Sequence, residues 1–130
     1  MTPARTVLAV FLGYLAFLLV EVAGNLIAGV LLCSTSRGTL ILTGELVTVV
    51  SAAIAGAVAA RVASTRPLAH AGALGLAIFS VTAIASAAIP PRAPSPFPAW
   101  FPYVNAVLGG VGAFMGGAIV ALREDSSQAG

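Results

Sequence analysis

The sequence predicts an all-α integral membrane protein, a bundle of four transmembrane helices. Of its 130 residues, 59% are hydrophobic and only 8% are charged. A soluble domain has about a quarter of its residues charged, so this chain has too few charges to cover a surface that faces water. Four runs of about 20 mostly apolar residues, divided by polar or proline-rich segments, give the number of helices.

The first predicted span covers residues 7–32 and is followed by the polar segment 34–38. At about 1.5 Å per residue this run would be ~39 Å long, more than the ~30 Å hydrocarbon core. The helix is therefore expected to tilt, or to kink near Gly24. A cleaved signal peptide fits less well, because the apolar run resumes after Gly24 and becomes too long for one.

The second predicted span covers residues 40–62, and Arg61 and Pro67 close it. The third covers residues 68–89 and stops at the proline-rich segment 90–98, whose composition favours extended backbone over helix.

The fourth predicted span covers residues 102–122 and starts at Pro102, a residue that suits the first turn of a helix. A polar C-terminal tail is predicted for residues 123–130. The transmembrane domain as a whole is predicted at residues 1–122, with no second domain.

The positive-inside rule predicts that both termini are cytoplasmic. With four spans the termini share one side of the membrane, and that side carries more of the arginines: Arg5, Arg61, Arg66 and Arg123. Arg37 and Arg92 fall on the other side. We therefore expect a multi-pass protein of the cell inner (plasma) membrane.

Two carboxylates and two amides inside the predicted spans are candidates for a binding site: Glu21, Asn25, Glu45 and Asn105. Glu21 and Asn25 are four residues apart, so they share one helical face. Depth along the helices puts all four in the outer half of the bilayer, where converging faces would form a cavity that opens outward. A carboxylate costs about 2.5 to 3.5 kcal/mol at a helix centre, so each one must be sheltered, paired or used.

Two interpretations of these residues stay open. In the first, the carboxylates bind protons or a cation and exchange one for the other. In the second, Glu21 only fixes helix packing, Glu45 meets Arg37 at the outer interface, and the two amides are hydrogen-bonding glue between helices.

Rows of small residues are expected to let helix backbones approach closely. The second span carries Ala52 and Gly56 four residues apart, and the fourth carries the GxxxG pair Gly112 and Gly116. Another small row of the fourth span begins at Gly109. These rows predict packing inside one bundle. The alternative is that one row of the fourth span serves a homo-oligomer or partners in a membrane complex.

No catalytic set, metal-ligand cluster or nucleotide-binding loop is recognisable, so neither enzymatic activity nor a cofactor or metal is expected. His70, the single histidine, lies at the start of the third span, where an interfacial role is expected. One histidine cannot supply two haem ligands, although a single axial ligand at a subunit interface stays open. The arginines are scattered along the chain and do not predict nucleic-acid binding.

The Ala-Ala-Arg at residues 59–61 and the Arg-Pro-Leu-Ala-His-Ala at residues 66–71 resemble a pattern in small four-helix bacterial inner-membrane proteins of uncharacterised activity. In those proteins too, a small-residue helix ends in Ala-Ala-Arg, and the next helix opens with His-Ala. A proline-containing loop and a glycine-rich last helix also recur. The resemblance implies a fold and no activity.

The Glu-Val-Ala-Gly at residues 21–24 is similar to the Glu-Val-x-Gly of small multidrug-resistance transporters. In that family the glutamate binds protons and cationic drugs in a dimer, and the resemblance implies such a role for Glu21 alone. The chain departs from the family elsewhere, because its third span lacks Trp and Tyr.

The favoured functional prediction is a non-enzymatic accessory or scaffold component that packs against partners in the lipid bilayer. The alternative is a small proton-coupled transporter or exporter that acts as an oligomer through Glu21. A third interpretation is an accessory subunit of a pigment or haem protein, to which the chain would contribute His70.

Overall fold

The structure, a computed structural model, describes residues 3–32, 36–63, 66–89 and 97–128. These residues form four α-helices: α1 (Pro3–Leu31), α2 (Arg37–Ala63), α3 (Pro67–Ala88) and α4 (Phe101–Gln128). The all-α fold class predicted from the sequence is therefore confirmed. Most of the proline-rich segment, together with Cys33 and Arg92, lies outside the described residues.

Prolines set the ends of α3 and the start of α4. Pro67 occupies the first turn of α3 and follows Arg66, whose φ of 52° and ψ of 57° are left-handed. The helix stops before Ile89, which is extended, as expected of a residue that precedes a proline. At α4 the backbone N–H of Phe101 donates to the carbonyl of Pro98 over 3.0 Å and opens the first turn.

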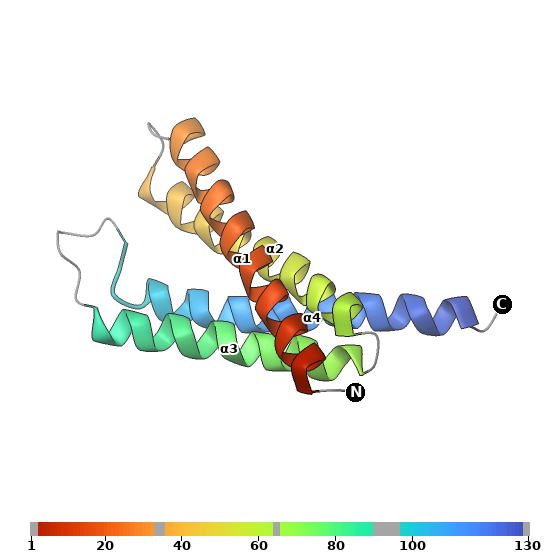
Figure 1. Cartoon of the computed structure of the whole chain (residues 1–130). Coiled ribbons are helices and arrows are strands. Elements are labelled where there is room, and N and C mark those ends of the chain that lie inside the picture. Colours follow the sequence, from red (N-terminus) through yellow and green to blue (C-terminus); the bar gives the residue numbers. More distant parts are fainter. Residues whose placement is uncertain (1–2, 33–35, 64–65, 90–96, 129–130) are drawn as a thin grey trace.

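The four helices form two antiparallel pairs that cross each other (Figure 1). α1 packs along α2 and α3 packs along α4, while α2 is central because it contacts each of the other three. α1 also contacts α3, but it does not reach α4 anywhere in the described ranges. The two pairs diverge toward the end where α1 gives way to α2 and α3 to α4 (Figure 1), which we call the fork end.

Glycines bring the backbones of α2 and α4 into contact. A Cβ atom on Gly56 would collide with the carbonyl oxygen of Ala113, and one on Gly116 would collide with that of Ala53. The position of a Cβ on Gly112 is 2.8 Å from the carbonyl oxygen of Val49. Only glycine at these positions lets the two helices approach so closely.

The second small face of α4 packs against α3. A Cβ on Gly109 would lie 2.9 Å from Cγ2 of Ile78, and one on Gly117 would collide with Cβ of Ala71. The two small-residue faces of α4 are therefore both covered by helices of the same chain.

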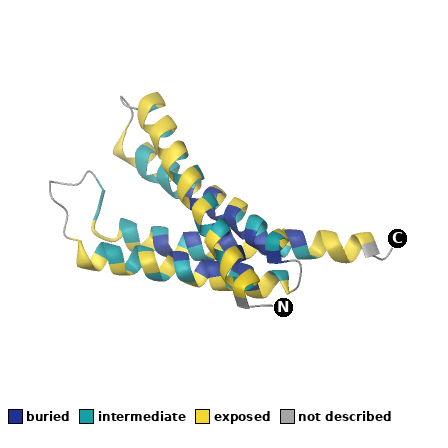
Figure 2. Cartoon of the chain, in the orientation of Figure 1, coloured by how far each residue is buried: buried dark blue, intermediate teal, exposed yellow. Residues whose placement is uncertain are grey.

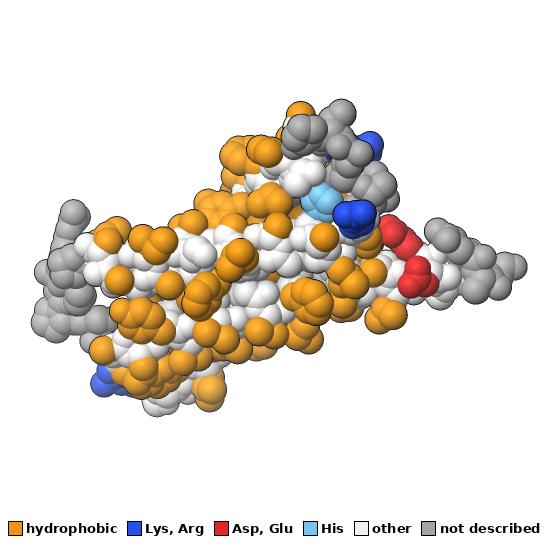
Figure 3. Space-filling model, turned by 90° about the horizontal axis from the view of Figure 1, so that it is seen from below, with side chains coloured by type: hydrophobic (Ala, Val, Ile, Leu, Met, Phe, Trp, Pro, Cys, Tyr) orange, Lys and Arg blue, Asp and Glu red, His pale blue; other side chains and the backbone are white. Residues whose placement is uncertain are grey.

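Small residues fill the inside of the bundle and large apolar residues cover its outside. The buried positions gather where the helices cross (Figure 2). The core consists of alanines around a few larger side chains, namely Phe17, Leu74 and Ile78. By contrast Leu26 is 66% exposed and Leu76 67% exposed, and many other large apolar side chains on all four helices are like them. Apolar side chains dominate the face in Figure 3, and the charged ones visible there lie toward the ends.

This arrangement fits lipid rather than water as the surrounding solvent. Each of the four helices contains a stretch long and apolar enough to cross a membrane. The chain has the features of a multi-pass membrane protein, as its composition predicts.

The helices run past the predicted spans at several ends. α1 begins at Pro3, and α4 continues through the start of the predicted polar tail to Gln128. The hydroxyls of Ser126 and Ser127 donate to carbonyls three residues back, over 2.9 and 2.8 Å. The described part of the tail is thus helical and prolongs α4.

Candidate functional site

Glu21 is held by two polar neighbours, one on its own helix and one on α2. The hydroxyl of Thr48 donates to Oε1 of Glu21 over 2.7 Å. The amide of Asn25 donates to the same oxygen over 3.2 Å and to the backbone carbonyl of Glu21 over 2.9 Å. Thr48 is 1% exposed, so its hydrogen bond to Glu21 lies in the interior between α1 and α2.

Glu45 lies on α2, one helical turn before Thr48, and is close enough to Glu21 for the two carboxylates to repel each other. Both of its carboxylate oxygens are buried and have no hydrogen-bond partner. The ion pair with Arg37 expected as one interpretation is not found within the described ranges. Glu45 therefore faces inward without a cationic neighbour there.

Asn105 lies on α4, so α4 joins α1 and α2 in this region. Its side-chain oxygen is buried without a hydrogen-bond partner, and so is Oε2 of Glu21. Together with the oxygens of Glu45 these atoms form a group of buried acceptors without donors. A buried acceptor left unpaired costs about 1 to 3 kcal/mol, so a donor or a cation beside these oxygens would be favourable.

A cavity of about 190 Å³ lies beside these residues at the fork end. α1 contributes Glu21 and Asn25 to its lining, α2 contributes Thr43 and Gly44, and Asn105 comes from α4. The cavity is thus lined by three of the four candidate residues predicted from the sequence. Glu45 does not line it, but its carboxylate is near that of Glu21.

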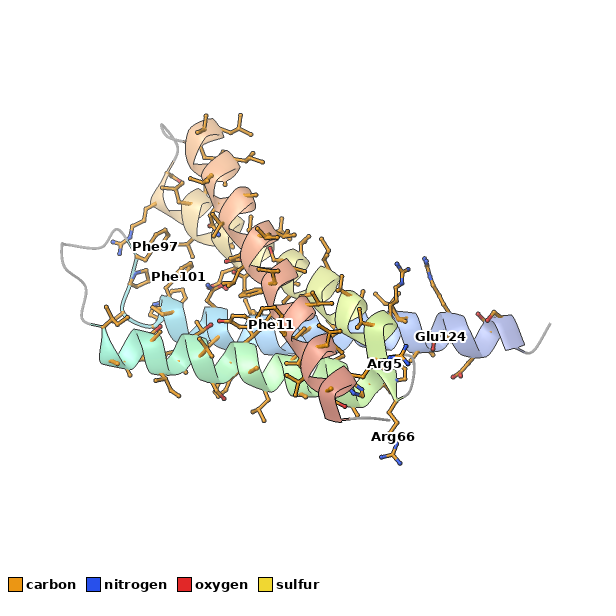
Figure 4. All side chains as sticks on the ribbon, in the orientation of Figure 1. Arg5, Phe11, Arg66, Phe97, Phe101 and Glu124 are labelled. Carbon is orange, nitrogen blue, oxygen red and sulfur yellow. The ribbon has the colours of Figure 1, made fainter. Side chains whose placement is uncertain are left out.

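Two phenylalanine rings form the apolar wall of this cavity. Phe97 and Phe101 both line it, and their rings stack with centroids 4.5 Å apart and an interplanar angle of 15°. Figure 4 shows both side chains in the region between the α1–α2 and α3–α4 pairs. The lining of the cavity therefore combines one carboxylate and two amides with two aromatic rings.

The sequence did not single out three of these residues as parts of the site. Thr48 lies three residues after Glu45 on the same helical face, and this spacing could have predicted that Thr48 belongs to the site. No sequence pattern links Phe97 and Phe101 to Glu21, because their position beside it follows from the angle between the helix pairs.

His70 lies far from this site, at the opposite end of the bundle. It is 6% exposed, and its Nδ1 is 3.0 Å from the carbonyl oxygen of Arg66. Its Nε2 is 3.3 Å from the hydroxyl of Thr6 on α1. With Nδ1 as donor, Nε2 accepts from Thr6, and both nitrogens are in use; a metal or haem bond would have to replace one of these contacts.

The predicted packing residues lie at helix crossings. Gly56, Gly112 and Gly116 lie between α2 and α4, Gly109 lies against α3, and Ala52 is fully buried next to Gly112.

No protein-family model, curated protein or solved structure matches this chain.

Proposed function

We propose that this chain is a small, non-enzymatic transport protein of the inner membrane that binds a cation at Glu21 and Glu45 in exchange for protons. The observation that carries the proposal is the group of buried oxygens without donors, contributed by Glu21, Glu45 and Asn105. All of them can accept hydrogen bonds, and protons or a cation would satisfy them. A cation that binds between two neighbouring carboxylates displaces the protons that they carry.

The accessory or scaffold role has less support from the geometry. It was predicted largely from the small-residue faces of the second and fourth spans. Those faces pack against each other and against α3 within one chain, so they are not available to partners. Assembly with a second copy or with other membrane proteins stays a prediction.

Proton release on cation binding tests the proposal. The purified protein in mild detergent and weak buffer is mixed with sodium chloride, or with tetramethylammonium chloride, and an indicator dye records the pH. We expect the wild type to release protons and Glu21→Gln to release none. Glu124→Gln is the matched control, because Glu124 is an exposed carboxylate near the end of α4, and it should behave as the wild type.

Two outcomes would contradict the proposal. One is a wild-type protein that releases no protons with either salt between pH 5 and 9. The other is Glu21→Gln that releases as many protons as the wild type. A Glu21→Gln protein whose assembly mass changes while proton release is retained would favour the accessory role instead.

We further propose that both termini are cytoplasmic. Arg5, Arg61, Arg66 and Arg123 lie on helix ends that share one end of the bundle, whereas Arg37 opens α2 at the fork end. The site then faces the outer half of the membrane. A fluorescent protein fused to the C-terminus should fold and fluoresce in cells, since its fluorescence needs a cytoplasmic position; an exported alkaline phosphatase fused there should be inactive.

A further inference from the structure

The rings of Phe97 and Phe101 are a wall between two cavities. On one side is the 190 Å³ cavity that contains Glu21. On the other side is a larger cavity of about 630 Å³, which reaches the end of α3 at Ile89 and the start of α4 at Tyr103. Both phenylalanines line both cavities, so the stacked pair is what separates them.

The larger cavity borders exposed aromatic residues. It lies at the fork end, next to Trp100 and Tyr103, which are 52% and 49% exposed. Exposed Trp and Tyr at a helix end are typical of the membrane interface. A solute that comes from this side therefore meets the aromatic pair before it meets the carboxylates.

The ring of Phe101 lies against α2 at a position where residue 44 is glycine. Its ring atom Cζ is 3.2 Å, and Cε2 is 3.9 Å, from the position that a Cβ on Gly44 would occupy. The ring thus extends from the first turn of α4 to the backbone of α2 and spans the distance between the two helix pairs at that level. The ring of Phe101 is half-buried and has no hydrogen bond to break, so a rotamer change can move it out of the wall.

We propose that Phe101 is the gate of the cavity that contains Glu21: its ring controls access from the larger cavity to Glu21. The wall opens when the ring turns away from Gly44, and the two cavities then become continuous. The identity of the solute as a cation rests on the proposed function, whereas the control of access does not.

Labelling of the buried carboxylates by a water-soluble carbodiimide measures this access. The purified protein in mild detergent is treated with the reagent, and mass spectrometry follows labelling of Glu21 and Glu45 over time. We expect Phe101→Ala to be labelled at least about tenfold faster than the wild type, and Phe101→Tyr to stay close to it. Phe114→Ala is the matched control, since Phe114 is on the same helix, is 50% exposed and lines neither cavity.

Equal labelling rates in Phe101→Ala and the wild type would overturn the gate. Phe97→Ala removes the other half of the same wall and gives a second measurement if Phe101→Ala does not fold; it too should accelerate labelling, and an unchanged rate counts against the gate.

The same experiment separates the gate from the proposed function. Sodium or tetramethylammonium ions added before the reagent should protect the carboxylates if they bind there. Faster labelling in Phe101→Ala without protection by either ion supports the gate and contradicts the cation site. Protection by an ion with equal labelling rates supports the cation site and contradicts the gate.

Discussion

The backbone of Gly116 in α4 lies against the carbonyl oxygen of Ala53 in α2, with no space between them for a Cβ atom. We expect Gly116→Ala to destabilise the protein by about 3 kcal/mol, because one of the two helices must move away. Denaturation by sodium dodecyl sulfate, followed by circular dichroism, measures the change. Gly72→Ala is the control, since a Cβ there meets nothing within 4 Å; it should be neutral or stabilising by about 0.5 to 1 kcal/mol. Equal stabilities of the two variants would contradict this account of the α2–α4 crossing.

The hydrogen bond from Thr48 to Glu21 ties α2 to α1 in the interior. Thr48→Val keeps the shape of the side chain but removes the donor, so we expect a loss of about 1 to 3 kcal/mol in the free energy of unfolding. The same denaturation experiment measures it. Thr82→Val on α3 replaces a hydroxyl for which the described residues offer no partner, and it should change stability by less than about 0.5 kcal/mol. If both variants lose the same stability, the bond to Glu21 contributes nothing specific.

The repulsion between Glu45 and Glu21 should be visible in a double-mutant cycle. Glu45→Gln removes a buried carboxylate without a partner and adds a donor amide, so we expect it to stabilise the protein by about 1 kcal/mol at pH 8. In the Glu21→Gln background the gain should shrink, because the neighbouring charge is already absent. An identical gain in both backgrounds would mean that the two side chains do not interact.

His70 links the starts of α1 and α3 through Thr6. We expect His70→Ala to lower the free energy of unfolding by about 2 to 3 kcal/mol, because it leaves a cavity and removes the hydrogen-bond partner of Thr6. Thr6→Val removes only one of the two contacts and should lose about 1 kcal/mol. A His70→Ala protein as stable as the wild type would contradict a structural role for this residue.

The helices were predictable because their cause is local, whereas the site depends on how they cross. Runs of apolar residues between polar or proline-rich segments mark each span, and the i, i+4 spacing already puts Glu21 and Asn25 on one face. Small residues occur on so many positions of α2 and α4 that the sequence offers several possible crossings. The one adopted, with Gly56 against Ala113, decides which side chains of α2 and α4 reach Glu21. The aromatic wall was missed for the same reason.

The partner of Glu21 lies later in the chain than Glu21 itself, and this has a consequence for synthesis. Thr48 follows it by 27 residues, and at about 5 to 20 residues per second the ribosome needs roughly 1 to 5 s to produce that stretch. During this interval α1 has entered the insertion machinery with an intramembrane carboxylate that only Asn25, on the same helix, can contact. We therefore expect α1 and α2 to enter the lipid as a hairpin rather than one at a time, because Thr48 then reaches Glu21 at once.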